Sequence, residues 1–274
     1  MQTLKAIQLK ARHQVYTLLS GHNLSKLHGE GYDFAELREY QMGDDIRKIN
    51  WTISAKLGKP YIKELHSNRE LSVVVAALMD GSVYFGADNA KQEKITEIAT
   101  LLGYSAQQSN DLFTGISYTS DNIYSTPPTK QIFHIEQFSQ HLYDTPLLHT
   151  TLDTKKSLHN LFTRLYKPSL LFILSDFLQE MDLSLLAQKH EVIAIIVRDI
   201  DEETPKKLSE VTLSDPRKNH TMHTYFGRKT LLTYMAKRQA HDDNLAEHFA
   251  KYDIRSVKIF TNEDPIRKLM QLLS

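Results

Sequence analysis

The sequence predicts an α/β protein built on one doubly wound, mostly parallel β-sheet. From residue 71 onward, short apolar runs recur, and each is bounded by polar loops. Amphipathic segments long enough to be helices lie between or after these runs. The runs are nearly continuous in apolar character, which is typical of strands buried on both faces of a sheet. Helices on both faces of a single sheet satisfy all three observations.

The N-terminal 70 residues are organised differently. Residues 3–19 place Leu4, Ile7, Val15 and Leu18 on one helical face before Ser20-Gly21, so we predict one helix there. The following residues are rich in glycine and charge and have no helical period. Three short apolar pieces separated by turn signals predict strands or extended segments: YDFAEL, DIRKINW and PYIKEL.

The remaining chain supplies the sheet and its helices. Strands are predicted at residues 71–78, 111–119, 130–135, 169–176, 191–197 and 254–260. Helices are predicted at residues 90–108, 153–166, 178–189 and 229–252. Residues 199–226, with alternating VTL and TMHTYF pieces, predict a small β insertion of hairpin type. We therefore expect two parts, residues 1–70 and residues 71–274.

Composition narrows the classes of function. Lysine and arginine number 33 against 33 aspartate and glutamate residues, so no net charge favours nucleic acid as a partner. The absence of cysteine excludes disulfides and thiolate chemistry. The N-terminus does not read as a secretory signal, and no apolar run approaches the 18 residues of a membrane span. We expect a cytoplasmic protein.

Two polar pairs follow strands of the predicted sheet. Asp80 and Ser82 come after LSVVVAAL, and Ser175 and Asp176 come at the end of the run containing LLFIL. Ligands of doubly wound sheets bind outside the carboxyl ends of the strands. Carboxylate and hydroxyl oxygens there suit a hard ion such as magnesium. The alternative is that these side chains cap turns, and spacing alone favours the caps.

Other catalytic motifs are missing. The sequence has no GxxxxGK[ST] loop and no HExxH pair, and Ser82 does not lie in a GxSxG elbow. If nucleotide energy is involved, another protein must supply it.

The densest group of charges lies in ELREYQMGDDIRKINW, residues 36–51. Its candidate residues are Arg38, Glu39, Tyr40, Asp44, Asp45, Arg47 and Trp51. They can form a partly buried arginine–carboxylate network that fixes an irregular segment, or a docking surface for a partner. We weigh the network above docking, and on that interpretation Arg38 and Arg47 are partly buried and Arg47→Ala lowers the melting temperature sharply.

At these residues the sequence resembles the bacterial "domain of unknown function 58" proteins. The resemblance is carried by SGHNLSKLHGEGYDFAELREYQMGDDIRKINWTISAK, by Arg69-Glu70 and Phe85-Gly86, and by LSDF at 174–177. It implies a von Willebrand factor A-like, Rossmann-like domain, in agreement with the strand pattern. It also implies that the protein acts as a chaperone-like adaptor together with a MoxR-type AAA+ ATPase.

Domains of that type often carry a metal-ion-dependent adhesion site with the loop DxSxS, a threonine and a further aspartate. Here the loop reads LMDGS, with Leu78 at the first aspartate, Asp80 at the first serine and Ser82 at the second. Thr151 fits the threonine, although an ungapped fit places Leu152 there, and Asp176 matches the last aspartate. The implied site is degenerate, so we expect no cofactor and at most weak binding of magnesium or manganese.

The favoured function is a non-enzymatic adaptor that docks a MoxR-type AAA+ ATPase or its client through the degenerate site or the charged segment. The alternative is a metal-dependent hydrolase that uses Asp80 and Asp176. A third class is a self-assembling module that associates through the helix predicted at residues 229–252.

Overall fold

Six strands form the central sheet of the computed structural model, which describes residues 3–22, 34–65, 71–85, 90–120, 122–205, 210–218 and 220–273. The strands are β3 (Ser72–Leu78), β4 (Leu112–Thr119), β5 (Asn122–Ser125), β6 (Leu170–Ser175), β7 (Glu191–Arg198) and β10 (Arg255–Phe260). Their order across the sheet is β10-β7-β6-β3-β4-β5, with β5 antiparallel to β4 and the other pairs parallel. The winding reverses between β3 and β6, which makes that point the switch point of a doubly wound sheet.

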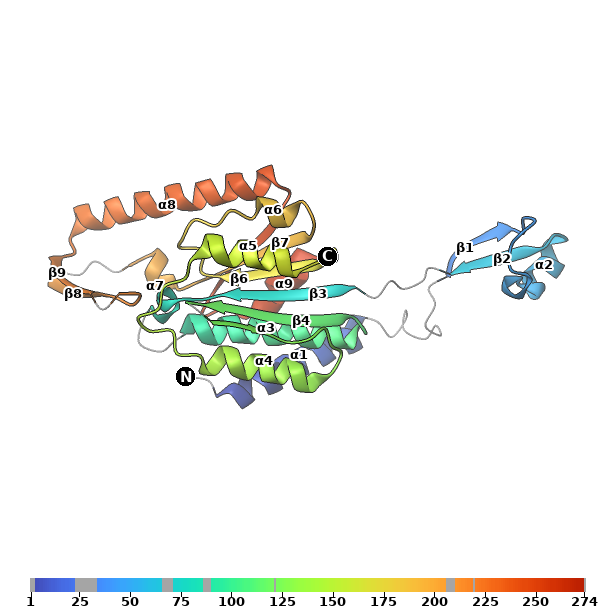
Figure 1. Ribbon diagram of the computed structural model, residues 1–274, viewed down its shortest axis with the longest axis horizontal. Helices are drawn as coiled ribbons and strands as arrows, with labels where there is room; N and C mark the ends of the chain where they lie inside the picture. The colour runs from blue at the N-terminus through green and yellow to red at the C-terminus, as the bar shows by residue number, and fades with distance from the viewer. Residues whose placement is uncertain are drawn as a thin grey trace. The chain divides into compact units, whose positions relative to one another are not determined.

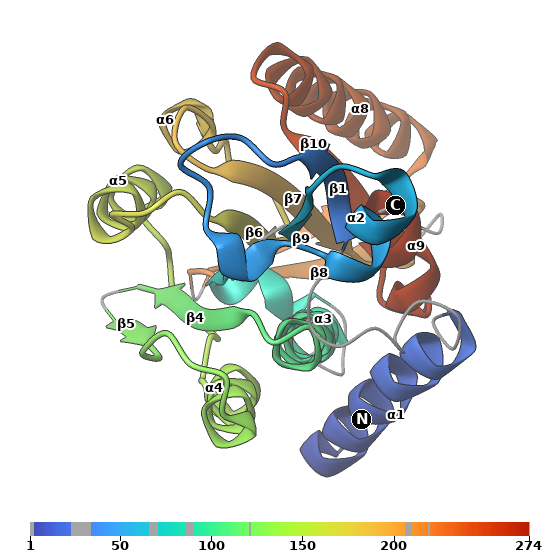
Figure 2. The same cartoon turned by 90° about the vertical axis from the view of Figure 1, so that its right-hand side faces the viewer.

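Helices cover both faces of this sheet (Figures 1 and 2). One face carries the first part of α1 (Leu4–His22), together with α3 (Ala90–Gln108), α4 (Ile132–Asp144) and α9 (Pro265–Leu273). The other face carries α5 (Thr154–Arg164), α6 (Ser184–Ala187) and α8 (Arg228–Lys251). The α/β class predicted from the sequence is confirmed.

The two covered faces explain the continuous apolar runs. Successive residues of a strand point to opposite faces, and β3 is buried on both. Val74, Ala76 and Leu78 belong to a core cluster that also contains Leu158 of α5 and Phe249 of α8. The intervening positions are equally buried, so a polar side chain has no place on either face of this strand.

The strands predicted at residues 71–78, 111–119, 169–176, 191–197 and 254–260 are confirmed, as are the helices at 90–108, 153–166 and 229–252. Two predictions for residues 71–274 are wrong. KQIFHI is not a strand but leads into α4, whose buried residues Ile135, Phe138 and Leu142 recur at helical spacing. Only the short helix α6 forms within residues 178–189. Met181 and Leu183 lie in the loop before it, and each buries its side chain without being part of a helix.

The structure divides into two compact units, residues 16–70 and residues 1–15 with 71–274. The first part of α1 thus groups with the sheet, where Ile7, Ala11 and Val15 are buried at every fourth position. In the small unit, β1 (Phe34–Glu39) pairs antiparallel with β2 (Tyr61–Leu65), so two of the three predicted extended pieces are strands.

The third piece, DIRKINW, is not extended. It forms a short 3-10 helix, η1 (Ile46–Lys48), and the beginning of α2 (Trp51–Leu57). The Asn50 side chain accepts a hydrogen bond from the Ile53 amide and caps α2, and Gly58 ends the helix with φ 70°. Asn50 is a local signal for the start of a helix, but the apolar residues of DIRKINW led to the prediction of an extended segment.

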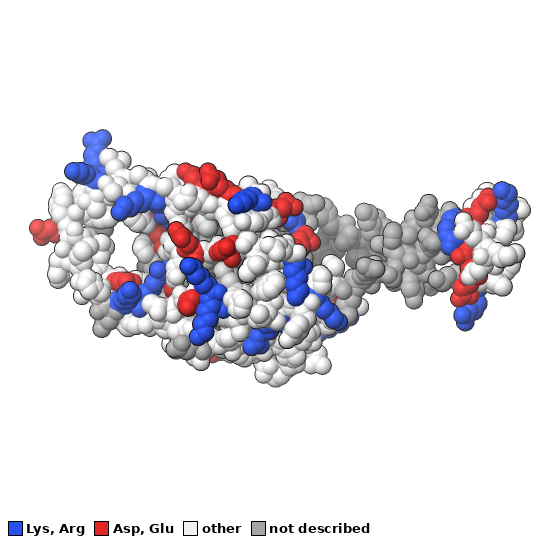
Figure 3. Space-filling view, turned by 45° about the horizontal axis from the view of Figure 1, so that its top comes forward, with Lys and Arg blue, Asp and Glu red and all other residues white. Residues whose placement is uncertain are grey.

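The predicted insertion is a hairpin of β8 (Glu210–Asp215) and β9 (His220–Tyr225), preceded by the short helix α7 (Ile200–Glu203). Figure 3 shows lysine and arginine side chains interspersed with aspartate and glutamate on the face in view, with no large area of one sign. Among the described helices, none has the length and apolar character required to cross a membrane.

Candidate functional site

The candidate site lies at the carboxyl edge of the sheet, at its switch point. Asp80 follows β3 and Asp176 follows the neighbouring strand β6, and both are buried. Ser82, in the short helix η2 (Gly81–Tyr84), joins them: its amide donates to Asp80 Oδ1 at 2.8 Å, and its hydroxyl hydrogen-bonds Asp176. The structure therefore brings together the three predicted residues Asp80, Ser82 and Asp176.

Asp80 is paired with a basic side chain from the hairpin. Arg217 Nε lies 3.1 Å from Asp80 Oδ2, and Gln179 Nε2 donates to the same oxygen at 2.5 Å. With the Ser82 amide, these contacts neutralise the carboxylate and occupy both of its oxygens. Asp80 is thus the N-cap of η2 and also half of an ion pair, so the cap interpretation and a site interpretation describe the same residue.

Asp176 is paired with a fully buried lysine from the first turn of α3. Lys91 Nζ lies 3.2 Å from Asp176 Oδ2 and 3.1 Å from Glu202 Oε1, and the lysine side chain has no exposed surface. Burial by itself would raise the pKa of Asp176. The Lys91 ammonium, the Ser82 hydroxyl, the Leu178 amide and the Arg198 guanidinium outweigh that effect and lower the pKa.

The tip of the β8–β9 hairpin packs directly on the loop that follows β3. The His149 amide donates to the Pro216 carbonyl at 2.8 Å, and the Gly81 amide donates to the Thr150 carbonyl at 3.0 Å. A Cβ on Gly81 would lie 2.2 Å from the Pro216 carbonyl oxygen, so only glycine permits this approach. The insertion is therefore part of the site, and it delivers Arg217.

Arg217 is fixed through its backbone amide and its Nε atom, and part of its side chain is accessible. Its backbone amide donates to Asp215 Oδ1 at 2.9 Å, which fixes the turn, and its Nε faces Asp80. The side chain keeps 26% of its surface exposed, and within the described parts of the chain its two Nη groups have no hydrogen-bond partner. A guanidinium in this state offers directed donors to a carboxylate or phosphate group.

The site does not fit the metal that the resemblance implies. Leu78 and Leu152, at two of the ligand positions, are buried in the same core cluster, and Thr151 is exposed. The remaining carboxylates, Asp80 and Asp176, are each committed to a basic side chain. Across the residues that the structure describes, no group of three or more histidine, aspartate and glutamate side chains could hold an ion. Magnesium requires near-octahedral oxygen coordination, which this donor set does not supply.

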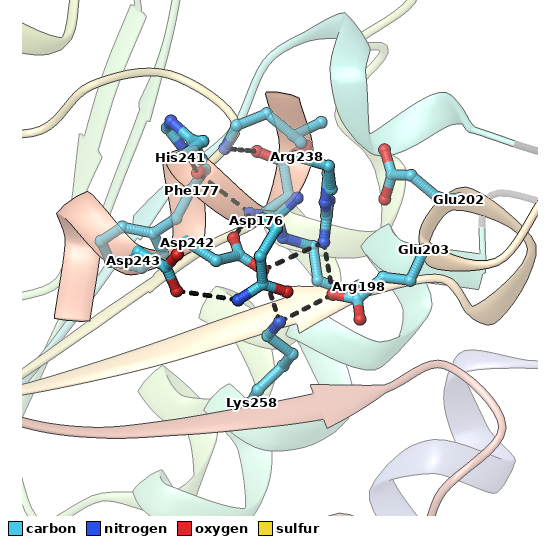
Figure 4. A network of polar contacts seen from close by, with 12 residues as sticks. Asp176, Phe177, Arg198, Glu202, Glu203, Arg238, His241, Asp242, Asp243 and Lys258 are labelled. Atoms are coloured by element: carbon cyan, nitrogen blue, oxygen red, sulfur yellow. Dashed lines mark hydrogen bonds and ion pairs between the residues drawn. The ribbon is translucent and has the colours of Figure 1, made fainter. Parts of the chain in front are cut away.

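A second charged network continues from Asp176 toward α8 (Figure 4). Phe177 has a left-handed φ of 49°, and its carbonyl accepts hydrogen bonds from Arg198 Nη2 at 3.1 Å and His241 Nε2 at 2.7 Å. Arg198 is fully buried and lies 3.4 Å from Asp242, which is also 2.7 Å from Lys258 Nζ. These contacts fix the loop after β6 in a conformation that phenylalanine rarely adopts.

The charged segment of the small unit has one firm ion pair and one exposed pair. Arg38 binds Asp44 through two hydrogen bonds of 2.8 Å, and Asp44 also accepts from the Gln41 amide, so this pair closes the turn. Arg47 pairs with Asp45, but its side chain is 91% exposed, so the expectation of a partly buried Arg47 is wrong. Of the other candidates, Glu39 binds the exposed Lys59, Tyr40 is half-buried and Trp51 is exposed.

Several residues of the family-like motif, Arg69, Glu70 and Gly86 among them, lie outside the described residues. The same holds for the side chain of Glu36.

The two arginines should differ in their effect on stability. Arg38→Ala removes a two-pronged bond to a largely buried carboxylate and is expected to cost about 1–2 kcal/mol of the free energy of unfolding. Arg47→Ala removes an exposed contact and should cost less than about 0.5 kcal/mol. Urea titration of both variants, followed by Trp51 fluorescence, measures the difference. Equal losses would contradict this assignment.

Sequence patterns did not identify Lys91, Gln179, Glu202 or Arg217 as part of the site. One signal for Lys91 existed. A cation in the first turn of a helix is disfavoured by the helix dipole, so a lysine at the second position of α3 calls for a compensating carboxylate. Arg217 carries no comparable signal, because arginine is common in exposed turns.

Comparison with known proteins places these residues in a family context. The family model described as "Protein of unknown function DUF58" matches residues 36–244. Uncharacterized proteins of Mycobacterium bovis and Mycobacterium tuberculosis are each 30% identical over 83 residues, which is 30% of this chain and 26% of theirs. The match thus spans about a quarter of the length of these relatives. A crystal structure of the conserved hypothetical protein BatB from Bacteroides thetaiotaomicron aligns over 74% of this chain and 97% of its own, with 12% identity and a TM-score of 0.42.

Proposed function

Because the chain belongs to the DUF58 family of proteins of unknown function, we propose its role from the site: it is a non-enzymatic adaptor that binds a partner protein at the carboxyl edge of its sheet. The partner that the family resemblance implies is a MoxR-type AAA+ ATPase or a client of that ATPase. Docking does not require a divalent metal ion, and the adaptor acts in the cytoplasm.

The observation that carries the proposal is the state of Arg217. Asp80 holds this guanidinium through Nε, the side chain keeps 26% of its surface exposed, and among the described residues the two Nη groups have no hydrogen-bond partner. A charged group that is already oriented loses little side-chain entropy when it binds, so it contributes more to affinity than a free surface arginine. An acidic side chain of the partner is the complementary group.

The small unit supports a second docking surface. Met42, Ile46, Trp51 and Leu57 are all exposed, although a unit of this size would be expected to bury such side chains in its own core. Tryptophan is also enriched among the residues that dominate binding energy at interfaces. We therefore assign Trp51 to partner binding and the Arg38–Asp44 pair to the scaffold that supports it.

The state of the carboxylates supports an adaptor rather than a hydrolase. A metal-dependent hydrolase needs carboxylates that are free to hold a metal ion and to activate water. Asp80 and Asp176 are instead hydrogen-bonded and paired with Arg217 and Lys91.

The test is affinity purification of the tagged protein from its own cells, with and without EDTA, followed by mass spectrometry. An AAA+ ATPase should be recovered equally in both conditions. Arg217→Ala should reduce recovery about 10-fold or more, since a hydrogen bond to a charged group contributes roughly 1.5–3 kcal/mol.

Arg255→Ala is the matched control. This arginine is partly exposed and paired with Glu191, but it begins β10 and so lies at the opposite edge of the sheet. Trp51→Ala in the same experiment measures the contribution of the small unit. Loss of the ATPase in EDTA, or recovery of no ATPase at all, would contradict the proposal.

A further inference from the structure

Two carboxylates lie beside each other in the interior of the sheet unit, and one ammonium group joins them. Asp176 and Glu202 come from the loop after β6 and from α7, and their side chains are each 5% exposed. Lys91 Nζ lies within 3.2 Å of both. The contacts are three: one to Asp176 Oδ2 and one to each oxygen of Glu202.

The position of Lys91 is not explained by the stability of its helix. It stands in the first turn of α3, where the helix dipole repels a positive charge. A buried lysine is tolerated only where carboxylates compensate its charge, and here Asp176 and Glu202 do so. The buried Arg198 guanidinium also interacts electrostatically with both carboxylates. Without the ammonium, the two buried carboxylates would exceed the charge of that one guanidinium, and the pocket would carry a net negative charge.

The donors around Lys91 are the kind that a divalent cation uses. Asp176 and Glu202 supply carboxylate oxygens, and the Ser82 hydroxyl already contacts Asp176. Hard divalent ions bind oxygen ligands of this kind together with water. In the native chain the Lys91 ammonium lies between the two carboxylates and supplies the positive charge.

We infer that Lys91 is a built-in cation that replaces a divalent metal ion at this edge of the sheet, and that its removal converts the pocket into a divalent-metal site. The inference does not depend on the adaptor function, because it concerns the occupant of the buried pocket and not the partner. It implies that the Lys91 ammonium always occupies the site and that the site does not respond to the concentration of free metal ions.

The experiment uses the purified full chain, as wild type and as Lys91→Ala, with manganese chloride as the probe. Wild-type protein should show no manganese-dependent rise in melting temperature. Lys91→Ala should melt at a lower temperature, and manganese should raise that temperature again by several degrees. Calorimetric titration should give one ion per chain, bound at least about 10-fold more tightly than by the wild type.

The matched control is Lys94→Ala. Lys94 is also buried on α3, and it binds Glu97 Oε2 at 2.6 Å and the Glu263 carbonyl at 2.7 Å, away from Asp176 and Glu202. This variant should lose stability without any response to manganese. The double variant Lys91→Ala/Asp176→Ala should lose the response as well.

Lys91→Gln provides a second route if Lys91→Ala does not fold without metal. The glutamine is shorter and neutral, and its amide oxygen adds a ligand. Folding of either variant in manganese but not in sodium chloride of equal ionic strength would support the inference. Equal binding by the wild type, or no response of either variant to manganese, would overturn it.

Discussion

Leu78→Asp, which restores the first acid of the resembled metal motif, is expected to unfold the sheet unit rather than create a metal site. Leu78 is 1% exposed and packs in the core cluster on the face covered by α5, α6 and α8. The change removes buried apolar contacts and places a carboxyl group among apolar side chains, with a combined cost on the order of 5 kcal/mol. That is a large share of the roughly 5–15 kcal/mol by which a domain is stable.

Circular dichroism and urea titration measure this loss. Leu78→Met is the control, since it retains an apolar side chain of similar volume and should cost less than about 1.5 kcal/mol. A Leu78→Asp protein that melts near the wild-type temperature and is stabilised by magnesium would contradict the placement of Leu78 in the core.

The second large effect concerns Asp176. Asp176→Asn keeps the shape of the side chain but leaves Lys91 with one carboxylate partner, Glu202, in a buried site. Removing one member of a buried ion pair is strongly destabilising, so we expect a loss of about 3 kcal/mol at neutral pH. The leading alternative function would predict loss of hydrolysis instead, with stability little changed.

The pH dependence of this effect has a defined sign. The folded protein lowers the pKa of Asp176 below its usual value of 3.8. The stabilising contribution is therefore complete above that usual value and is lost as the pH falls through the lower folded value. The difference in unfolding free energy between wild type and Asp176→Asn should be constant from pH 7 to 5 and should narrow below pH 4.

Urea titrations at pH 7, 5 and 3 test this expectation. Asp153→Asn is the control, because Asp153 is an exposed N-cap of α5 and asparagine caps helices equally well. A difference that stays constant down to pH 3 would show that the charge of Asp176 is not what stabilises the site.

Local patterns predicted most of the sheet because its strands are buried on both faces. The central positions of a strand such as β3 or β7 must then all be apolar, and that signal does not depend on the rest of the chain. The same reasoning failed at KQIFHI, where an apolar cluster of strand-like length belongs to an amphipathic helix. Six residues are too few to separate the two periods.

The candidate site was predicted in part. Asp80, Ser82 and Asp176 could be named because the ends of adjacent parallel strands meet at one edge of a sheet, whatever the intervening sequence. The exposure of Arg47 could not be predicted, since a run of mixed charges is compatible with either a buried network or a solvated turn.

By itself, then, the sequence determined the α/β class, the position of the strands and the edge at which polar side chains gather, because each follows from the local order of apolar and polar residues. The tertiary structure decided what those side chains do. Lys91 lies 85 residues from Asp176 in the chain, and Arg217 lies 137 residues from Asp80. An ion pair depends on separation in space and on burial, and neither is encoded in local periodicity.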